Sequence, residues 1–236
     1  MSIKRFTMTG ADNSISISDL NDMAYRFPFS EWGILVSGKQ YGNKRFPSKA
    51  WIDQLMNEGW EGLNLSCHLC GQFVRDILMG NDAPIRDLGV LWDMFARVQI
   101  NTHGMPHSFD AVKMVELLTA QTGKEFIFQY DNCNAEILEA AINGGVKCST
   151  LFDLSHGAGV LPTEWPRPLN NISCGYAGGL SPENLDSQIQ LIESKVGDAN
   201  IWIDMETHVR SNNDQLFDLQ KVELCFNIAS KYIPCP

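Results

Sequence analysis

The sequence predicts one (β/α)₈ barrel that spans residues 1–236, and three observations support this fold class. Strand-like and helix-like stretches alternate along the chain with short connections. Eight strand-like stretches in a chain of 236 residues are typical of this barrel. Several of these stretches are almost continuously apolar, as expected for parallel strands that are covered on both faces. The same alternation also allows an open, doubly wound sheet, which is the alternative.

The expected strands are short runs rich in apolar or β-branched residues, each bounded by turn residues. In chain order they are residues 6–9, 32–37, 62–67, 97–101, 125–130, 148–154, 171–176 and 200–205. The expected helices have apolar residues at helical spacing, and they are residues 18–26, 48–58, 71–79, 108–121, 134–143, 182–195 and 216–231. The interval 157–169 is rich in Pro and Gly, so no helix is expected there.

Composition narrows the class of protein. Apolar residues make up 44% of the chain and charged residues 19%, which is typical of a globular protein. The net charge of −10 makes a nucleic-acid partner unexpected, and no apolar run is long enough to predict a membrane span. No apolar signal core follows the first residues, and the seven cysteines are scattered, so we expect reduced thiols and a cytoplasmic location. A monomer or a homodimer is expected.

A glycine-rich turn after the seventh expected strand is the most specific local feature. Gly178 and Gly179 allow backbone N–H groups to approach a ligand closely. Ser181, Pro182 and Glu183 favour the start of a helix, because Ser can cap it, Pro suits its first position and Glu suits its positive end. A strand, a glycine turn and a helix N-terminus together predict an anion site, most often for phosphate. A tight turn without a ligand is the alternative interpretation.

The carboxyl ends of the expected strands are rich in polar residues. In a (β/α)₈ barrel these ends form the active site. The polar residues at or just after them are Thr9, Asp12, Ser37, Lys39, Arg45, Cys67, His68, Cys70, Asn101, His103, Gln129, Asp131, Asn132, Asp153, Ser155, His156, Asp204, Glu206, His208 and Arg210.

The order of several motifs resembles the phosphoribosylanthranilate isomerase family, whose members are barrels of tryptophan biosynthesis. Residues 178–185, Gly-Gly-Leu-Ser-Pro-Glu-Asn-Leu, resemble the family's phosphate loop after strand seven almost letter for letter. Asp153, followed by a glycine loop at residues 157–159 and an aromatic residue, resembles its strand-six segment. Residues 101–104, Asn-Thr-His-Gly, resemble its Gln-Leu-His-Gly. Arg45 resembles the substrate-binding arginine after strand two, and Asp204 lies in the segment that resembles the end of strand eight.

The resemblance implies an Amadori rearrangement of a small phosphorylated aminosugar by acid–base catalysis, without a cofactor. Asp153 matches the family's general acid, and Arg45 matches the residue that binds the anthranilate carboxylate. A planar guanidinium suits such a bidentate contact. The positions expected to bind the substrate are Arg45, His103, Gly157, Gly178, Gly179, Ser181 and Asp204.

The chain departs from the family at two strand ends. Thr9-Gly10 stands where the family has Cys-Gly, whose Cys is the base, and a Thr hydroxyl without an adjacent base accepts protons poorly. Candidate bases are Thr9 with a water molecule, Asp12 and Cys67, and His68 beside Cys67 is a further option. At strand eight, residues 206–210 read Glu-Thr-His-Val-Arg, where the family has Ser-Ser-Gly-Val-Glu. Glu206 would add negative charge beside a bound phosphate.

Three alternative functions stay open at this point. A diverged barrel enzyme, such as a lyase or an aldolase, would explain the missing Cys. A metal-assisted reaction would need imidazole and carboxylate ligands from several strands, but the spacing of the residues selects no ligand set. The pair Cys67 and Cys70 has the spacing of a zinc or redox site but lacks a second close pair, so no metal is expected. A binder of a phosphorylated ligand without catalysis is the third alternative.

Overall fold

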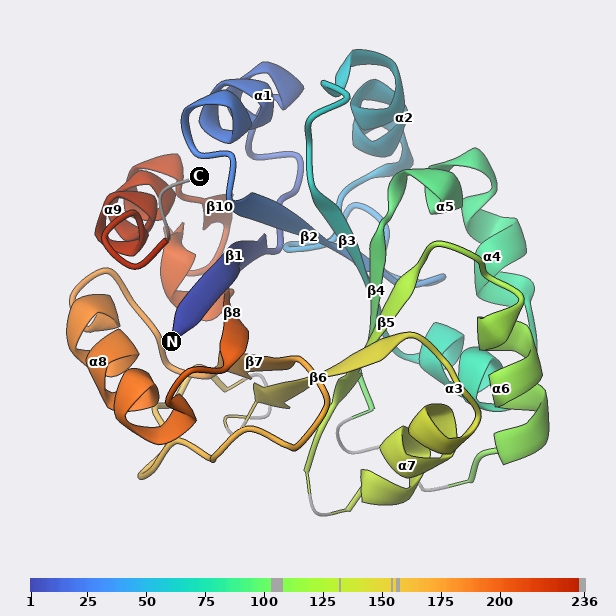
Figure 1. Cartoon of the computed structure of the whole chain (residues 1–236). Coiled ribbons are helices and arrows are strands. Elements are labelled where there is room, and N and C mark those ends of the chain that lie inside the picture. Colours follow the sequence, from blue (N-terminus) through green and yellow to red (C-terminus); the bar gives the residue numbers. More distant parts are fainter. Residues whose placement is uncertain (103–107, 132, 154, 156–157, 234–236) are drawn as a thin grey trace.

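The computed structural model describes the chain except residues 103–107, 132, 154, 156–157 and 234–236. Eight parallel strands close into a barrel in sequential order, and helices surround it (Figure 1). This confirms the (β/α)₈ fold class. The barrel strands are β1 (Ser2–Thr9), β2 (Ser30–Val36), β3 (Leu65–Leu69), β4 (Arg97–Ile100), β5 (Glu125–Gln129), β6 (Cys148–Asp153), β7 (Cys174–Ala177) and β8 (Asn200–Met205).

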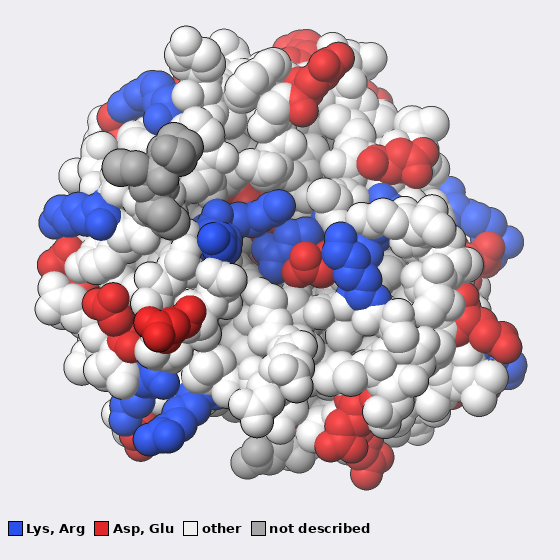
Figure 2. All heavy atoms as spheres, viewed as in Figure 1, with Lys and Arg blue, Asp and Glu red and all other residues white. Residues whose placement is uncertain are grey.

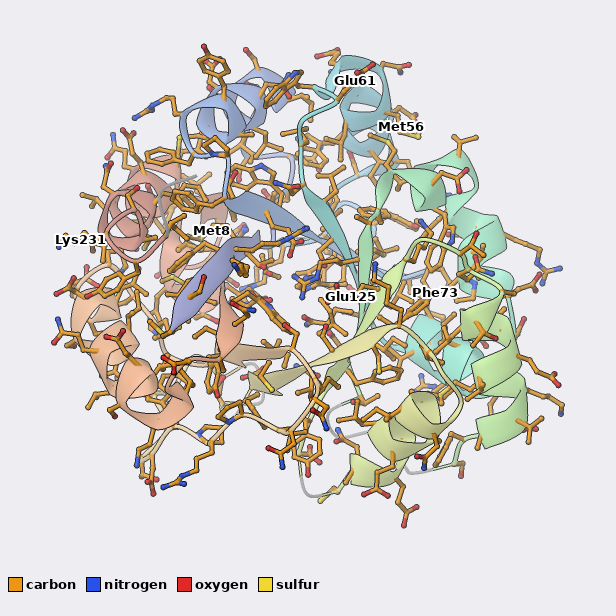
Figure 3. All side chains as sticks on the ribbon, viewed as in Figure 1. Met8, Met56, Glu61, Phe73, Glu125 and Lys231 are labelled. Carbon is orange, nitrogen blue, oxygen red and sulfur yellow. The ribbon has the colours of Figure 1, made fainter. Side chains whose placement is uncertain are left out.

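The helices lie outside the barrel, and their apolar sides pack against the strands in one continuous core. They are α1 (Ile17–Arg26), α2 (Lys49–Glu58), α3 (Gln72–Leu78), α4 (Ala83–Leu88), α5 (Val90–Met94), α6 (Ala111–Thr119), α7 (Ala135–Asn143), α8 (Leu185–Val196) and α9 (Leu219–Ala229). Several helices begin at a side-chain cap, such as Ser16 before α1 and Asp218 before α9. Met8 on β1 and Phe73 on α3, both labelled in Figure 3, belong to this core.

The inside of the barrel has its own organisation, because alternate residues of each strand point inward. At the end where the strands begin, Glu31 is fully buried and accepts hydrogen bonds from Arg5, Thr7 and Arg97 at 2.8–2.9 Å. Arg97 also contacts Glu125, which Figure 3 labels near the barrel axis. Charged side chains gather at the centre of the face seen in Figure 2. This network closes one end of the barrel and leaves the opposite end for a site.

A second inner layer separates this network from the carboxyl ends of the strands. It is an apolar cluster of Ile127, Leu151, Ala177 and Trp202. The Trp202 ring lies where a side chain at Gly175 would be, and the Arg97 guanidinium stacks on the ring at 4.2 Å. The barrel is therefore filled below its upper rim, as expected for this fold.

Several expected boundaries were wrong. The third strand covers Leu65–Leu69 and not residues 62–67, because His68 and Leu69 still form ladder bonds with β4. The short helices α4 and α5 were not expected. The last helix begins at Leu219 and not at residue 216, because Leu216–Phe217 (β10) pair with Arg210–Ser211 (β9) in a small ribbon after the 3₁₀ helix η1 (Thr207–Val209). The absence of a helix over residues 157–169 agrees with the sequence analysis in the part that the structure describes.

The start of α8 also differs from the expectation. The helix begins at Leu185, so Ser181 and Pro182 precede it and do not form its cap and first turn. The reason is local: the Asn184 side chain folds back, accepts the Ser181 N–H at 2.9 Å and donates to the Gly179 carbonyl at 2.9 Å. These two hydrogen bonds stabilise the glycine turn, and the helix begins only after it.

Candidate active site

A cavity of about 210 Å³ opens at the carboxyl ends of the strands. Its lining comes from seven of the eight strands or the loops that follow them, and it is mostly polar. The lining residues are Thr9, His68, Gln99, Asn101, Gln129, Leu151, Asp153, Ser155, Gly159, Ala177, Gly178, Gly179, Leu180, Asp204, Met205, Glu206, Thr207 and His208. The cavity thus lies where (β/α)₈ enzymes place their active sites.

Three carboxyl groups of the described residues face this cavity, and Asp204 at the end of β8 is the most deeply buried of them. The Thr9 hydroxyl donates a hydrogen bond to Asp204 Oδ1 at 2.8 Å. Burial raises the pKa of Asp204 well above its usual value, and the negative charges of Glu206, Glu31 and Asp153 raise it further, whereas the Thr9 hydrogen bond lowers it. Asp204 is therefore the carboxyl group of this cavity whose surroundings most strongly favour its protonated form.

Asp153 ends β6 and is held by a different set of partners. Its Oδ1 accepts from the Ser155 hydroxyl at 2.8 Å and from the Ser155 N–H at 3.2 Å, and its Oδ2 accepts from Gln129 Nε2 at 3.2 Å. These bonds fix the direction in which the carboxylate faces. The cavity therefore contains two carboxyl groups in different surroundings, one oriented by several hydrogen bonds and one deeply buried.

Glu206 follows β8 and forms an ion pair with Arg45. Burial raises the pKa of Glu206, and the positive charge of Arg45 opposes this shift. Arg45 also contacts Asp214 at 2.9 Å and does not line the cavity. A substrate carboxylate could reach Arg45 only in competition with two acidic side chains of the protein itself.

The glycine turn forms another wall of the cavity. Gly178 and Gly179 have φ values of +114° and +65°, which favour glycine, and a Cβ on Gly179 would lie 2.2 Å from the Leu161 nitrogen. Within the described part of the chain, the N–H groups of Gly179 and Leu180 have no hydrogen-bond acceptor. Across the cavity rim, His208 Nε2 donates to the Gly159 carbonyl at 2.7 Å. Gly179 and Leu180 both line the cavity, so two backbone N–H groups without an acceptor in the described structure lie at its wall.

Two candidate bases from the sequence lie outside the cavity lining. Cys67 is fully buried among core residues, and burial raises the pKa of its thiol well above the usual value. Its strand neighbour His68 faces the cavity instead, because successive residues of a strand point to opposite sides. Asp12 is 5% exposed and accepts from Arg210 at 2.7 Å and from the Arg45 N–H at 2.9 Å. Asp12 therefore joins the loops after β1, β2 and β8, and neither residue is placed to act as the base.

The remaining expected positions are distributed as follows. Thr9, Asp153, Asp204, Gly178 and Gly179 come together around the cavity, whereas Ser181 lies just outside its lining. His103 and Gly157 lie outside the described residues. Sequence reasoning missed Gln99 as a site residue; only its place one residue before the polar end of a strand could have pointed to it.

Among the described residues, no three His, Cys, Asp or Glu side chains converge in a way that could hold a metal ion. The six described cysteines are free thiols, and burial raises the pKa of Cys70 to about 12. None of the described helices has both the length and the apolar character required to cross a membrane.

Comparison with known proteins supports the barrel fold. No protein-family model and no curated protein matches the chain. Among solved structures, phosphoribosyl anthranilate isomerase from Thermus thermophilus superposes with a TM-score of 0.62 at 13% identity, covering 98% of this chain and 99% of that one. TrpF from Jonesia denitrificans gives a TM-score of 0.60 at 15% identity, with 98% of both chains covered.

A third neighbour is similar to the same degree. It is a monomer form of the dimeric phosphoribosylanthranilate isomerase from Thermotoga maritima, with a TM-score of 0.57, 15% identity, and 98% of this chain and 99% of that one covered. At such identities the likeness shows a shared barrel fold. The structural neighbours therefore agree with the fold that the motif order implied.

Proposed function

We propose that this protein is an acid–base isomerase that acts on a small phosphorylated sugar derivative. The observation that carries the proposal is the pair of unlike carboxyl groups, Asp153 and Asp204, on one cavity. Moving a proton between neighbouring carbons requires a group that accepts a proton and a group that supplies one. Two carboxyl groups in different environments fill these two roles when their surroundings separate their proton affinities.

In this proposal, Asp204 supplies a proton to the carbonyl oxygen of the substrate while Asp153 removes the proton from the neighbouring carbon, which gives an enediol. Asp153 then returns its proton to the former carbonyl carbon, and the neighbouring hydroxyl group returns a proton to Asp204 as it becomes the new carbonyl group. Asp204 suits the first role because burial and neighbouring negative charges raise its pKa and so favour its protonated form. Asp153 suits the second because three hydrogen bonds orient its carboxylate. The sequence analysis assigned the acid to Asp153, so the cavity favours the reverse assignment.

Thr9 is a positioning residue in this scheme. Its hydroxyl donates to Asp204 Oδ1, and a hydroxyl that already donates to a carboxyl group is poorly placed to take a proton from the substrate. The position that is Cys in the resembled family thus orients the acid in this chain. Glu206 keeps its negative charge balanced by Arg45, which limits the repulsion that it would exert on a bound phosphate.

The phosphate would bind to the N–H groups of Gly179 and Leu180. These donors supply the local positive potential that a phosphate needs despite the acidic net charge of the chain. The names of the structural neighbours make phosphoribosylanthranilate one compound to test, together with aldose and ketose phosphates of five and six carbons. We also propose that residues 1–236 act as one domain without a resident cofactor.

The test is product formation from this panel, followed by nuclear magnetic resonance. Asp153→Asn and Asp204→Asn should each lower kcat about 10²- to 10⁴-fold, the usual contribution of a general acid or base. Asp53→Asn on the exposed face of α2 is the matched control and should keep full activity. Turnover that survives in both site variants would refute the assignment.

Thr9→Val separates positioning from structure. The Thr9 hydrogen bond lowers the pKa of Asp204, so its loss should raise that pKa further. Because Asp204 must be protonated, activity should persist to higher pH in the variant, while kcat falls about tenfold through poorer orientation. An alkaline limb that stays in place would argue against a bond between these residues in the active protein.

A further inference from the structure

Two buried polar atoms on the β3–β4 side of the cavity have no hydrogen-bond partner among the residues that the structure describes. They are His68 Nε2 and Gln99 Oε1, which belong to side chains that are 1% and 3% exposed. Both residues line the cavity. A buried polar atom without a partner costs free energy, so such atoms usually face a water molecule or a ligand.

The two side chains lie next to each other. His68 and Gln99 are partners in the register of β3 and β4, and neighbouring strands are about 4.8 Å apart. Gly33 on β2 lies beside them and has no side chain. A Cβ at this position would lie 2.4 Å from Thr9 Oγ1 and 3.0 Å from His68 Nε2, so it would fill the space between these two groups. The Thr9 hydroxyl and the imidazole are therefore at most 5.4 Å apart, the sum of these two distances. One small ligand group can thus meet His68 and Gln99 while it lies near the Thr9–Asp204 pair.

The charge state of these groups selects the kind of ligand group. Burial, and secondarily the charge of Arg97, lowers the pKa of His68 to about 3, so the imidazole is neutral at neutral pH. Gln99 Nε2 already donates to Asn101 Oδ1 at 2.8 Å, which leaves Gln99 Oε1 as an acceptor. A ligand group must therefore donate to Gln99 and pair with a neutral imidazole, and a hydroxyl can do both.

Other groups fit this place less well. A carboxylate would be repelled, because its lone pairs would face the lone pairs of Gln99 Oε1. A cationic amine would be repelled by the positive charge of Arg97, which already lowers the pKa of His68. An aromatic ring would need an apolar or aromatic slot. None of the described residues that line the cavity is Phe, Tyr or Trp. Of these groups, a hydroxyl therefore suits His68 and Gln99 best.

We propose that His68 and Gln99 form a hydroxyl-binding subsite, and that the substrate is a polyhydroxylated sugar phosphate without an N-aryl group. The assignment of a phosphate group to this substrate rests on the proposed function, whereas the assignment of hydroxyl groups rests on the two unpartnered atoms. The subsite would hold the hydroxyl-bearing carbons beside Asp204, with the phosphate at the glycine turn.

The experiment measures binding by isothermal titration calorimetry with four probes. These are inorganic phosphate, ribitol, ribitol 5-phosphate and the reduced form of the N-aryl aminoketose phosphate that phosphoribosylanthranilate isomerases produce. Wild type should bind ribitol 5-phosphate at least tenfold more tightly than both inorganic phosphate and the N-aryl compound. A tenfold gain corresponds to about one hydrogen bond of ordinary strength.

Gln99→Leu removes the acceptor at nearly constant volume, and His68→Phe replaces the imidazole by a ring that cannot hydrogen-bond. Each substitution should reduce the ratio of the affinity for ribitol 5-phosphate to the affinity for inorganic phosphate to threefold or less. Each should leave the affinity for inorganic phosphate unchanged. Gln54→Leu on the exposed face of α2 is the matched control and should keep the full advantage. Thermal unfolding confirms that a variant is folded, and either variant alone suffices if the other does not fold.

The outcomes separate the subsite from the phosphate site. Ribitol binding that depends on Gln99 or His68 without any phosphate binding would support the subsite and refute the proposed phosphate site. Phosphate binding to which the polyol adds nothing would overturn the subsite and leave the phosphate site standing. Tighter binding of the N-aryl compound than of ribitol 5-phosphate, or no binding of either ribitol probe, would also overturn the subsite.

Discussion

Replacing Glu31 by glutamine tests the ion-pair network at the lower end of the barrel. The Glu31 side chain is fully buried and accepts from Arg5 at 2.9 Å, from Thr7 at 2.8 Å and from Arg97 at 2.8 Å. Glutamine keeps the volume but removes the charge, so Glu125, at 3.2 Å, remains as the one acidic partner of the buried Arg97 guanidinium in the described part of the chain. Removing one member of a buried ion pair typically costs about 3–5 kcal/mol.

We expect a loss near the lower limit, about 3 kcal/mol, because Glu125 still compensates part of the Arg97 charge. For a chain of this length, each kcal/mol lowers the unfolding temperature by about 2–4 °C, which gives a decrease of about 6–12 °C. Calorimetry and urea unfolding at neutral pH measure the change. The control is Glu61→Gln at an exposed position, expected within about 0.5 kcal/mol of wild type. A loss below about 1 kcal/mol for Glu31→Gln would show that the network does not hold a buried charge as argued.

Three further predictions test the site and its surroundings. Gly179→Ala should cost about 1–3 kcal/mol in urea unfolding and weaken phosphate binding, because φ is +65° and the new Cβ would press on the Leu161 backbone; unchanged stability would contradict this. Cys67→Ala should lose about 1–2 kcal/mol of stability but keep kcat within twofold, and a large loss of kcat would restore Cys67 as a candidate base. Asp204→Asn should gain stability relative to wild type as pH rises from 4 to 8. The reason is that native wild type keeps a proton on Asp204 that the unfolded chain has released, whereas asparagine does not titrate. A constant difference in the free energy of unfolding across this range would mean that Asp204 is ionised in the native protein.

The fold could be predicted because each strand and helix carries its own pattern. Near-continuous apolar strands and helices with apolar residues at three- and four-residue spacing are local signals, and they determine the alternation that a barrel needs. His68 is a residue at which this reasoning fails. A polar residue suggested the end of a strand, but inside a barrel mouth it points inward and the strand continues. The helix start at Ser181 failed for a similar reason, since the Asn184 side chain competes for the same backbone groups.

The site was predictable only in part. Asp153, Asp204 and the two glycines could be found because strand ends and a motif indicate them. Their partners could not, because Thr9 meets Asp204 across 195 positions of sequence, and Arg45 meets Glu206 across 161. Such contacts depend on closure of the barrel between β1 and β8, which no local pattern specifies. The unpartnered atoms of His68 and Gln99 likewise exist only in the closed barrel.

The most direct test of the acid–base account is deuterium exchange in D₂O with the sugar phosphates of the panel. The account predicts that wild type incorporates deuterium at the carbon next to the carbonyl group. Asp153→Asn should slow this incorporation at least 100-fold, while Asp53→Asn leaves it unchanged. Incorporation that continues at the wild-type rate in Asp153→Asn, or a wild type that exchanges none of these compounds, would contradict the account.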